Sequence, residues 1–494
     1  MGAEPQRLHV VFFPLMAAGH LIPTLDIAKL FAAHHVKTTI ITTPLNAPCF
    51  TKPLESYKNL GHRIDIEIIP FPSKEAGLPE GLENFDQFTS DQMAVKFLKA
   101  TELLQESFEK FLEKHKPNCI VTDMLMPFTN NVAAKFNIPR IVFHGCSYFA
   151  LCMMHTLLKY QPHKSLLSDD EEFLVPNLPH EINLTRSRLP DMMRGQGDKE
   201  LNDAWMKIFI HAMEAEENSF GVIMNSFYEL EPEYVEYYRN VMGRKAWHIG
   251  PVSLCNRENE AKFQRGKDSS INEHECLKWL DSKKPKSVVY ICFGSLAEVP
   301  TLQLREIAMG LEASEQDFIW VVRRGKENVE EEKIEEWLPY DFEDRMEGKG
   351  LIIRGWAPQV LILDHEAIGA FVTHCGWNST LEGISCGVPM VTWPVFAEQF
   401  YNEKLVTEVL KTGVAVGAKK WSRILEVNLK SEDIKNAIRR VMVGEEALVL
   451  RSKAKKLKEL ARKAVEIGGS SYSDMHSLIQ DLSSYNANGY KQYL

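Results

Sequence analysis

The chain has 494 residues, of which 45% are hydrophobic and 25% charged, as is usual for a globular protein with a large apolar core. Its 67 acidic and 57 basic side chains give a formal net charge of −10, which argues against a nucleic acid partner because phosphate backbones need a basic surface. The 9 cysteines are odd in number and include no Cys-x-x-Cys pair, which argues against a disulfide framework or zinc knuckle and favours a reducing compartment.

The N-terminal region contains an apolar stretch, residues 8–19, that faintly resembles a signal peptide. Glu4 precedes this stretch and Pro14 interrupts it, which argues against secretion. No apolar run in the chain is long enough to cross a membrane. We expect a cytoplasmic monomer without a membrane span.

In the first half of the chain, short apolar runs alternate with helical patterns. Apolar positions at helical spacing predict a helix over residues 21–33. Strands are predicted at residues 9–15, 38–43, 65–70, 119–122 and 138–143.

The same alternation returns in the second half. Before it, residues 253–272 are polar, charged and aperiodic, which predicts a loop or linker after Gly250-Pro251. Further strands are predicted at residues 287–293, 317–322, 351–354, 369–373 and 389–393, and helices at 302–314, 448–465 and 473–483.

Two series of alternating strands and helices predict two parallel sheets, each covered by helices on both faces. We expect an α/β fold with two Rossmann-like, doubly wound domains that face each other across a cleft. The expected limits are 1–252 for the N-terminal domain, 253–272 for a linker and 273–470 for the C-terminal domain. Residues 471–494 are expected to form a helix that packs back on the N-terminal domain. Ligands of such sheets bind beyond the carboxyl ends of the strands.

One strand end in the second half carries a motif suited to a diphosphate. The predicted strand 369–373 runs into His374-Cys375-Gly376-Trp377, and Asn378-Ser379-Thr380-Leu381-Glu382 then opens a helix. Asn and Ser are good N-cap residues, and a helix start offers unpaired N–H groups and a partial positive charge to an anion. His374 could add another hydrogen-bond donor.

The segment from Trp356 to Gln399 resembles, position by position and at the same length, the signature box of plant family 1 UDP-dependent glycosyltransferases. The two-domain pattern agrees along nearly the whole chain. Details resemble the subgroup that acts on flavonoids, triterpenes and other phenolic or hormone-like acceptors. The resemblance implies a GT-B fold and the transfer of glucose from UDP-glucose to a hydroxyl of a small apolar metabolite, with inversion to a β-glucoside.

The resemblance also implies roles for the residues of the box. Trp356 would stack on uracil, the backbone of Ala357 would bind the base, and Gln359 and Glu382 would hold the ribose hydroxyls. The diphosphate would be bound by His374, Asn378 and Ser379, together with Ser295 from the turn after the strand at 287–293. The sugar would be contacted by Trp377, Glu398 and Gln399. A closing Gln in this family usually accompanies glucose, and a closing His often accompanies galactose.

A histidine and an aspartate follow two predicted strands of the first half. His20 comes shortly after the strand at 9–15, and Asp123 directly follows the strand at 119–122. A neutral imidazole, with a reference pKa of about 6.5, suits proton abstraction near pH 7. A carboxylate would fix its tautomer and stabilise the imidazolium. We predict His20 as the base that deprotonates the acceptor hydroxyl and Asp123 as its orienting partner, as the resemblance also implies.

The acceptor is expected to bind mainly to the N-terminal domain, around residues 79–89, 143–152 and 188–203. Such pockets are mostly apolar with a few polar groups. The candidates for the lining are Phe85, Phe88, His144, Phe149 and Trp205, although a structural role in the core is favoured for each. Some family members carry a Thr near His144 that contacts the sugar, and this chain has none there.

We expect no metal and no other cofactor, because no Asp-x-Asp motif stands at a strand end and no His-Glu-x-x-His occurs. The UDP-sugar would be a co-substrate, and helix N–H groups with His374 would stabilise the leaving diphosphate.

Other readings remain open. The donor could be UDP-glucuronic acid or UDP-galactose, or the chain could bind nucleotide sugars without catalysis. A serine hydrolase is disfavoured because Gly383-Ile384-Ser385-Cys386-Gly387 has a helix before it and a strand after it, the reverse of a nucleophile elbow. A nicotinamide dehydrogenase is disfavoured because only Gly19 stands where a Gly-x-Gly-x-x-Gly motif is needed.

Overall fold

The computed structural model describes residues 8–58, 61–88, 90–323, 337–423, 425 and 428–488. The chain divides into two compact units. Unit 1 comprises Met1–Gly145, Gly195–Arg257 and Ala464–Leu494, and unit 2 comprises Cys146–Arg194 and Glu258–Lys463. Both units are discontinuous in sequence, so the continuous limits 1–252 and 273–470 remain predictions.

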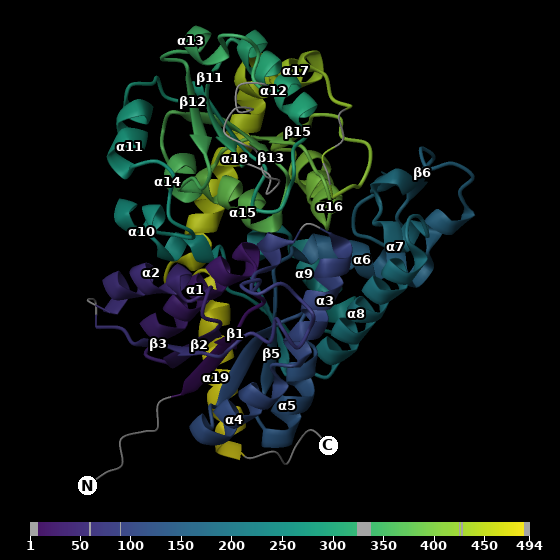
Figure 1. The fold of residues 1–494 in the computed structure, drawn as a ribbon, viewed down its shortest axis with the longest axis vertical. Helices are drawn as coiled ribbons and strands as arrows, with labels where there is room; N and C mark the ends of the chain where they lie inside the picture. Colours follow the sequence, from purple (N-terminus) through teal and green to yellow (C-terminus); the bar gives the residue numbers. More distant parts are fainter. Residues whose placement is uncertain are drawn as a thin grey trace. The chain divides into compact units, whose positions relative to one another are not determined.

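In the described part of unit 1, seven parallel strands form one sheet (Figure 1). The order across the sheet is β3-β2-β1-β4-β5-β8-β9. The strands are β1 (His9–Phe13), β2 (Lys37–Thr42), β3 (Ile64–Ile68), β4 (Cys119–Asp123), β5 (Arg140–His144), β8 (Gly221–Met224) and β9 (Ala246–His248). Strand order reverses between β1 and β4, the place where open α/β sheets bind ligands.

Alternate residues of β1 point into two hydrophobic clusters on opposite faces of this sheet. Val10 and Phe12 belong to one cluster, and Val11 and Phe13 belong to the other. The C-terminal helix α19 (Ser470–Asn488), yellow in Figure 1, contributes Met475, Leu478 and Leu482 to the first cluster. The other helices of unit 1 are α1 (Ala18–Ala33), α2 (Pro48–Lys58), α3 (Asp91–Glu102), α4 (Gln105–His115), α5 (Phe128–Phe136), α8 (Lys199–Glu217) and α9 (Pro232–Glu236).

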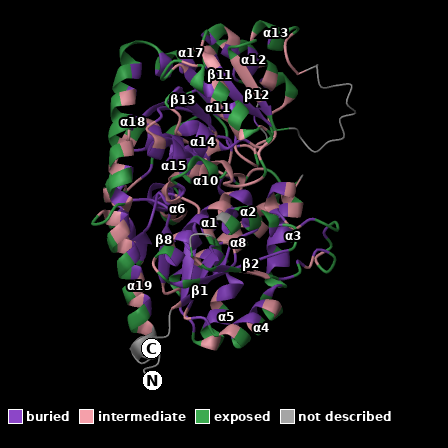
Figure 2. Cartoon of the chain, turned by 90° about the vertical axis from the view of Figure 1, so that its left-hand side faces the viewer, coloured by how far each residue is buried: buried purple, intermediate pink, exposed green. Residues whose placement is uncertain are grey.

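Unit 2 repeats the plan with six parallel strands in its described residues, in the order β12-β11-β10-β13-β14-β15. These are β10 (Val288–Cys292), β11 (Asp317–Val322), β12 (Gly350–Arg354), β13 (Ile368–Thr373), β14 (Met390–Thr392) and β15 (Gly413–Ala415). The strand order of this sheet reverses between β10 and β13. Figure 2 shows that in each unit the strands are buried while helices such as α18 and α19 expose one face.

The helices in the described part of unit 2 follow here in chain order. They are α6 (Tyr148–Tyr160), α7 (Asp191–Arg194), α10 (Asn259–Phe263), α11 (Glu273–Asp281), α12 (Thr301–Ser314), α13 (Phe342–Arg345), α14 (Gln359–Leu363), α15 (Trp377–Cys386), α16 (Gln399–Lys404), α17 (Ser431–Met442) and α18 (Gly444–Val465). A short antiparallel pair, β6 (Glu172–Leu174) with β7 (Asn183–Thr185), belongs to the same unit.

The structure contains secondary structure that the sequence analysis did not predict. Residues 253–272, expected to be a loop or linker, include part of a 3₁₀ helix at Val252–Cys255 and the helix α10. Lys262 on α10 is fixed by an ion pair with Asp364, 2.8 Å away, a contact that local sequence cannot reveal. The strands β6, β7, β8, β9 and β15 were not predicted; each has only three or four residues and so shows little periodicity.

Within the residues that the structure describes, no helix is both long and apolar enough to cross a membrane.

Candidate active site

His20 and Asp123 lie together at the carboxyl edge of the unit 1 sheet. His20 is in the first turn of α1, which follows β1, and Asp123 is the last residue of the neighbouring strand β4. Their Nδ1 and Oδ2 atoms are 2.5 Å apart, and the two side chains are 25% and 0% exposed. When Asp123 accepts the Nδ1–H hydrogen bond, the ring lone pair is on Nε2. The structure therefore brings the predicted base and orienter into direct contact.

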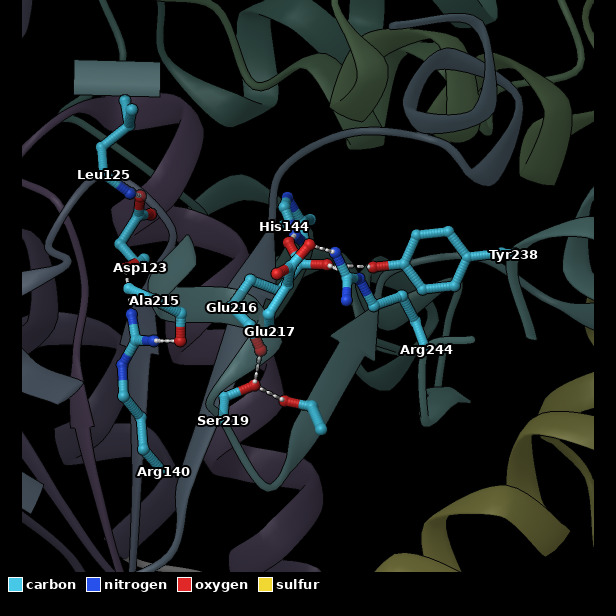
Figure 3. Close-up of polar contacts among 11 residues, drawn as sticks. Asp123, Leu125, Arg140, His144, Ala215, Glu216, Glu217, Ser219, Tyr238 and Arg244 are labelled. Carbon is cyan, nitrogen blue, oxygen red and sulfur yellow. Dashed lines mark hydrogen bonds and ion pairs between the residues drawn. The ribbon is translucent and has the colours of Figure 1, made fainter. Parts of the chain in front are cut away.

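Asp123 is held as a carboxylate by its surroundings. Burial alone would raise its pKa, but the adjacent His20, the hydrogen bond between them, the Leu125 N–H and the charge of His144 hold the pKa below its ordinary value. Leu125 N–H donates to Asp123 Oδ1 over 2.9 Å. Arg140 holds the end of β4 in place. Its Nη2 donates to the backbone oxygen of Asp123 over 3.4 Å, and its Nη1 donates to the backbone oxygen of Ala215 over 3.1 Å (Figure 3).

His144, proposed from sequence as a pocket residue, is part of a second histidine–carboxylate pair. Its Nε2 lies 2.5 Å from Glu216 Oε2, and Tyr238 donates its hydroxyl to Glu216 Oε1 over 2.7 Å (Figure 3). Burial by itself would raise the pKa of Glu216, but His144, Tyr238 and Arg244 hold it below its ordinary value. Among the described residues, nothing hydrogen-bonds to His144 Nδ1, which is buried.

Two of the acceptor-pocket candidates lie beside the loop that carries His20. Phe85 N–H donates to the backbone oxygen of Met16 over 2.6 Å, and its ring is 5.0 Å from that of Phe88. Both rings and Trp205 pack against the cluster that contains Phe13. The fourth apolar candidate, Phe149, is fully buried on α6 in unit 2, so the structure does not group it with the other three.

In unit 2, the predicted diphosphate residues follow the two central strands. The turn after β10 carries Gly294 and Ser295, and His374 follows β13. Gly294 has φ +72°, and a Cβ there would lie 2.5 Å from the imidazole of His374; a Cβ on Gly376 would come equally close. Only glycine at both positions lets this ring sit between the two turns.

His374 is a neutral ring in this setting. Burial lowers its pKa to about 4, although a hydrogen bond to the backbone of Cys292 acts in the opposite direction. Its Nδ1 has no hydrogen-bond partner within the described parts of the chain. The ring can therefore offer a directed hydrogen bond to a ligand rather than a permanent charge.

The predicted capping residues are not the cap of α15. Gly376 is the N-cap and the helix begins at Trp377, so Asn378 and Ser379 occupy the second and third helical positions. The prediction was wrong because the backbone is left-handed at Cys375, φ 65°, and the helix begins two or three residues earlier than the Asn-Ser pair indicates. Glycine provides no capping oxygen, so the first-turn N–H groups are not satisfied by an N-cap side chain.

The predicted ribose residues form one hydrogen-bonded group. Gln359 Nε2 donates to Glu382 Oε2 over 2.7 Å and to Ser379 Oγ over 3.0 Å. Arg265 Nη1 lies 2.5 Å from the other carboxylate oxygen, Glu382 Oε1. The structure thus joins Gln359, Ser379 and Glu382 and adds a cation that the sequence analysis did not single out.

The predicted base-binding pair precedes α14. The Trp356 side chain is half-buried, and Ala357 is buried. Trp356 is fixed through its backbone, since its N–H donates to Ser270 Oγ over 3.0 Å and its oxygen accepts from Ser270 N–H over 2.8 Å.

The three predicted sugar residues differ in their surroundings. Gln399 is buried, and its Oε1 accepts the N–H groups of Val395 and Phe396 over 2.9 and 3.0 Å. Its amide oxygen thus holds the turn before α16, and its Nε2 remains as a donor. Glu398 is half-buried and accepts from Asn402, while the ring of Trp377 is buried.

Three supporting residues escaped the sequence analysis: Arg140, Glu216 and Arg265. Each acts on a residue far along the chain, with Glu216 72 positions from His144 and Arg265 117 positions from Glu382. No spacing rule connects such pairs. Within the described residues there is no group of three or more His, Cys, Asp or Glu side chains that could hold a metal ion.

Comparison with known proteins shows the family of the chain. The family model described as "UDP-glucoronosyl and UDP-glucosyl transferase" matches residues 58–457. Scopoletin glucosyltransferase of Nicotiana tabacum is 57% identical over 98% of this chain and 100% of its own length. UDP-glucose flavonoid 3-O-glucosyltransferase 7 of Fragaria ananassa is 55% identical over 97% of this chain and 96% of its own.

Among solved structures, Glycyrrhiza uralensis UGT73P12, complexed with glycyrrhetinic acid 3-O-monoglucuronide, superposes with a TM-score of 0.89. It is 40% identical and covers 98% of this chain and 97% of that chain. The fold and family expected from residues 356–399 are confirmed. The chain belongs to the UDP-glucuronosyl and UDP-glucosyl transferase family, as a plant family 1 UDP-glycosyltransferase of the GT-B fold.

Proposed function

We propose that this enzyme transfers glucose from UDP-glucose to a hydroxyl of a small, largely apolar metabolite, such as a flavonoid, a triterpenoid or another phenol, and forms a β-glucoside. The donor is supported by the relatives, whose names specify glucosyl transfer. The observation that carries the mechanism is the 2.5 Å contact between His20 and Asp123 at the carboxyl edge of the unit 1 sheet.

The reaction follows from this pair. The acceptor hydroxyl gives its proton to Nε2 of His20 while its oxygen attacks the anomeric carbon from the face opposite the diphosphate. The bond from that carbon to the diphosphate oxygen breaks, and UDP leaves with the electron pair. Asp123 stabilises the imidazolium formed at His20. The proposed reaction therefore needs a base, assigned to unit 1, and a bound donor, assigned to unit 2.

Unit 2 is proposed to hold the donor. Trp356 and Ala357 would bind uracil, and the side-chain oxygens of Gln359 and Glu382 would accept hydrogen bonds from the ribose hydroxyls. The diphosphate would lie at the start of α15, where first-turn N–H groups favour an anion. Its proposed partners there are Ser295, His374, Asn378 and Ser379.

The sugar and the acceptor complete the proposal. Gln399 would donate its Nε2–H to sugar hydroxyls, with Glu398 and Trp377 beside it. The acceptor would lie against Phe85, Phe88 and Trp205. All three rings pack against the hydrophobic cluster that contains Phe13, and Phe85 is also hydrogen-bonded to the loop before α1. His144 is the most buried of the unit 1 candidates, and Phe149, fully buried in unit 2, remains a prediction.

We also propose that the protein works as a monomer in the cytoplasm, with domains at the limits expected from the sequence. Every residue proposed for either substrate comes from this one chain. All nine cysteines are thiols, as suits a reducing compartment. Light scattering after size-exclusion chromatography would test the monomer, for which a mass of 56.4 kDa is expected.

The decisive test is His20→Ala, assayed by product mass against a panel of apolar phenols and triterpenes with UDP-glucose. We expect kcat to fall by about 100-fold or more, because a positioned base contributes about 10²- to 10⁴-fold. The affinity for UDP, measured by calorimetry, should stay unchanged.

The matched control is His35→Asn, which alters an exposed histidine just beyond the same helix. It should keep wild-type turnover. Full turnover in His20→Ala would show that another group removes the proton.

A further inference from the structure

An arginine from the region after α10 is paired with the carboxylate proposed for the ribose. Arg265 Nη1 lies 2.5 Å from Glu382 Oε1, and the two side chains are only 8% and 5% exposed. Gln359 donates to the other oxygen, Oε2, over 2.7 Å. A carboxylate offers about four acceptor positions, so these two partners fix its plane and leave others for a ligand.

The same segment is attached to the residue proposed to stack on uracil. Ser270 exchanges two hydrogen bonds with the backbone of Trp356, and the ammonium of Lys267 lies 5.8 Å from the centre of its ring. Gly355 permits this approach, because its φ is +132° and a Cβ there would lie 2.1 Å from Ser270 Oγ. Residues 265–270 therefore contact both the base and the ribose parts of the proposed nucleoside site.

The buried pair has a direct electrostatic consequence. Without the guanidinium of Arg265, the buried carboxylate would lack a countercharge, so the Glu382 side chain would turn toward solvent and lose its geometry. That change would weaken hydrogen bonds from the two hydroxyls of a ribose.

We propose that Arg265 is a positioning residue for the ribose of the donor: it holds the carboxylate of Glu382 oriented to accept hydrogen bonds from the 2′- and 3′-hydroxyls. This inference rests on the proposed function. It assigns to residues 265–270, expected from sequence to be part of a linker, a part in recognising the nucleoside.

The test separates the ribose from the rest of the nucleotide. UDP and 2′,3′-dideoxy-UDP are titrated by calorimetry into the full-length wild type, Arg265→Gln and Arg265→Lys. We expect Arg265→Gln to weaken UDP by about tenfold or more, since hydrogen bonds to a charged group are at stake. Its affinity for dideoxy-UDP should stay within about twofold, and Arg265→Lys should recover part of the loss for UDP.

Kinetics and a matched control complete the design. In Arg265→Gln, KM for UDP-glucose should rise while kcat changes little, because the chemistry at the sugar is untouched. Lys262→Gln breaks the ion pair with Asp364 on the same segment but not the contact with Glu382, and it should bind UDP as the wild type does.

Two results would overturn the inference alone: Arg265→Gln binding UDP at wild-type strength, or losing affinity equally for UDP and dideoxy-UDP. The second result would show that Arg265 supports the fold or the phosphates rather than the ribose. If Arg265→Gln is unstable, the ratio of the two affinities in Arg265→Lys decides the same question. A wild type that does not bind UDP would instead overturn the proposed function.

Discussion

At the scale of single residues, the chemistry of this protein depends on buried partners. His20 has Asp123, His144 has Glu216, and Glu382 has Arg265, each at 2.5 Å. An ionisable group taken out of water keeps a useful protonation state only when such a partner compensates the lost solvation. The residues that could perform the reaction were predictable from type and position, but apart from the His20–Asp123 pair their partners were not.

Gln399 provides a prediction at this scale. Gln399→Glu keeps the oxygen that accepts from Val395 and Phe396 but removes the Nε2–H donor. We expect the turn to remain intact and KM for UDP-glucose to rise about tenfold. The rise corresponds to the loss of one hydrogen bond to a sugar hydroxyl, together with an unfavourable negative charge at the site. Initial rates at varied UDP-glucose would measure this.

A companion variant, Gln399→His, should lower the ratio of kcat/KM for UDP-glucose to that for UDP-galactose. The same assay should be run with UDP-glucuronic acid, the other alternative donor considered from the sequence. An unchanged donor ratio in both variants would mean that position 399 does not read the sugar.

At the scale of elements, both units place their candidate residues after the first and fourth strands of a sheet. In unit 1 these are β1 and β4, followed or ended by His20 and Asp123. In unit 2 they are β10 and β13, followed by Gly294 and His374. Adjacent parallel strands whose crossovers run to opposite sides leave an opening at their carboxyl ends. This topology, more than any single motif, brings the predicted residues together.

The turn around His374 allows a test of that arrangement. Gly376 has an ordinary φ of −59°, so Gly376→Ala adds no backbone strain, but its Cβ would lie 2.5 Å from the imidazole. We expect the displaced ring to weaken UDP binding about tenfold, as for the loss of one charge-assisted hydrogen bond. Calorimetry with UDP would measure the change.

The control is a double-mutant cycle. In a His374→Ala background there is no ring to displace, so Gly376→Ala should add little further loss. Additive losses in the cycle would show that the glycine matters for a reason other than the imidazole.

At the scale of the whole molecule, the end of the chain completes a core built from its beginning. Met475, Leu478 and Leu482 of α19 share a cluster with Val10 and Phe12 of β1. These contacts join residues from the two ends of the sequence. The core of unit 1 is therefore completed by residues that are synthesised last, although its sheet begins with residues that are synthesised first.

Leu478→Ala should destabilise unit 1 selectively. Leu478 is 0% exposed, and removing a fully buried leucine side chain costs about 2–5 kcal/mol. Hydrogen exchange measured by mass spectrometry should quicken in β1 and β2 peptides, while β10 and β13 peptides of unit 2 keep their protection.

Ile467→Ala is the control, because this side chain is 88% exposed and its removal should change stability by no more than about 0.5 kcal/mol. Equal acceleration in both units for Leu478→Ala would contradict the assignment of α19 to the unit 1 core.

The sequence by itself determined the fold class, the family and most of the strands. Period-two and period-3.6 patterns are local, and the segment from Trp356 to Gln399 carries its motif within one continuous stretch. His20 and Asp123 were predictable because each comes after a buried apolar strand: Asp123 ends β4, and His20 lies in the first turn of α1, the helix that follows β1.

Only the tertiary structure decided the rest. It paired Arg265 with Glu382 and His144 with Glu216, made Gly376 the cap of α15 in place of Asn378 or Ser379, and turned part of residues 253–272 into helix. It also divided each unit among separate stretches of chain. The physical reason is that burial, ion pairing and left-handed turns depend on neighbours distant in sequence, and no local pattern of residues encodes who those neighbours are.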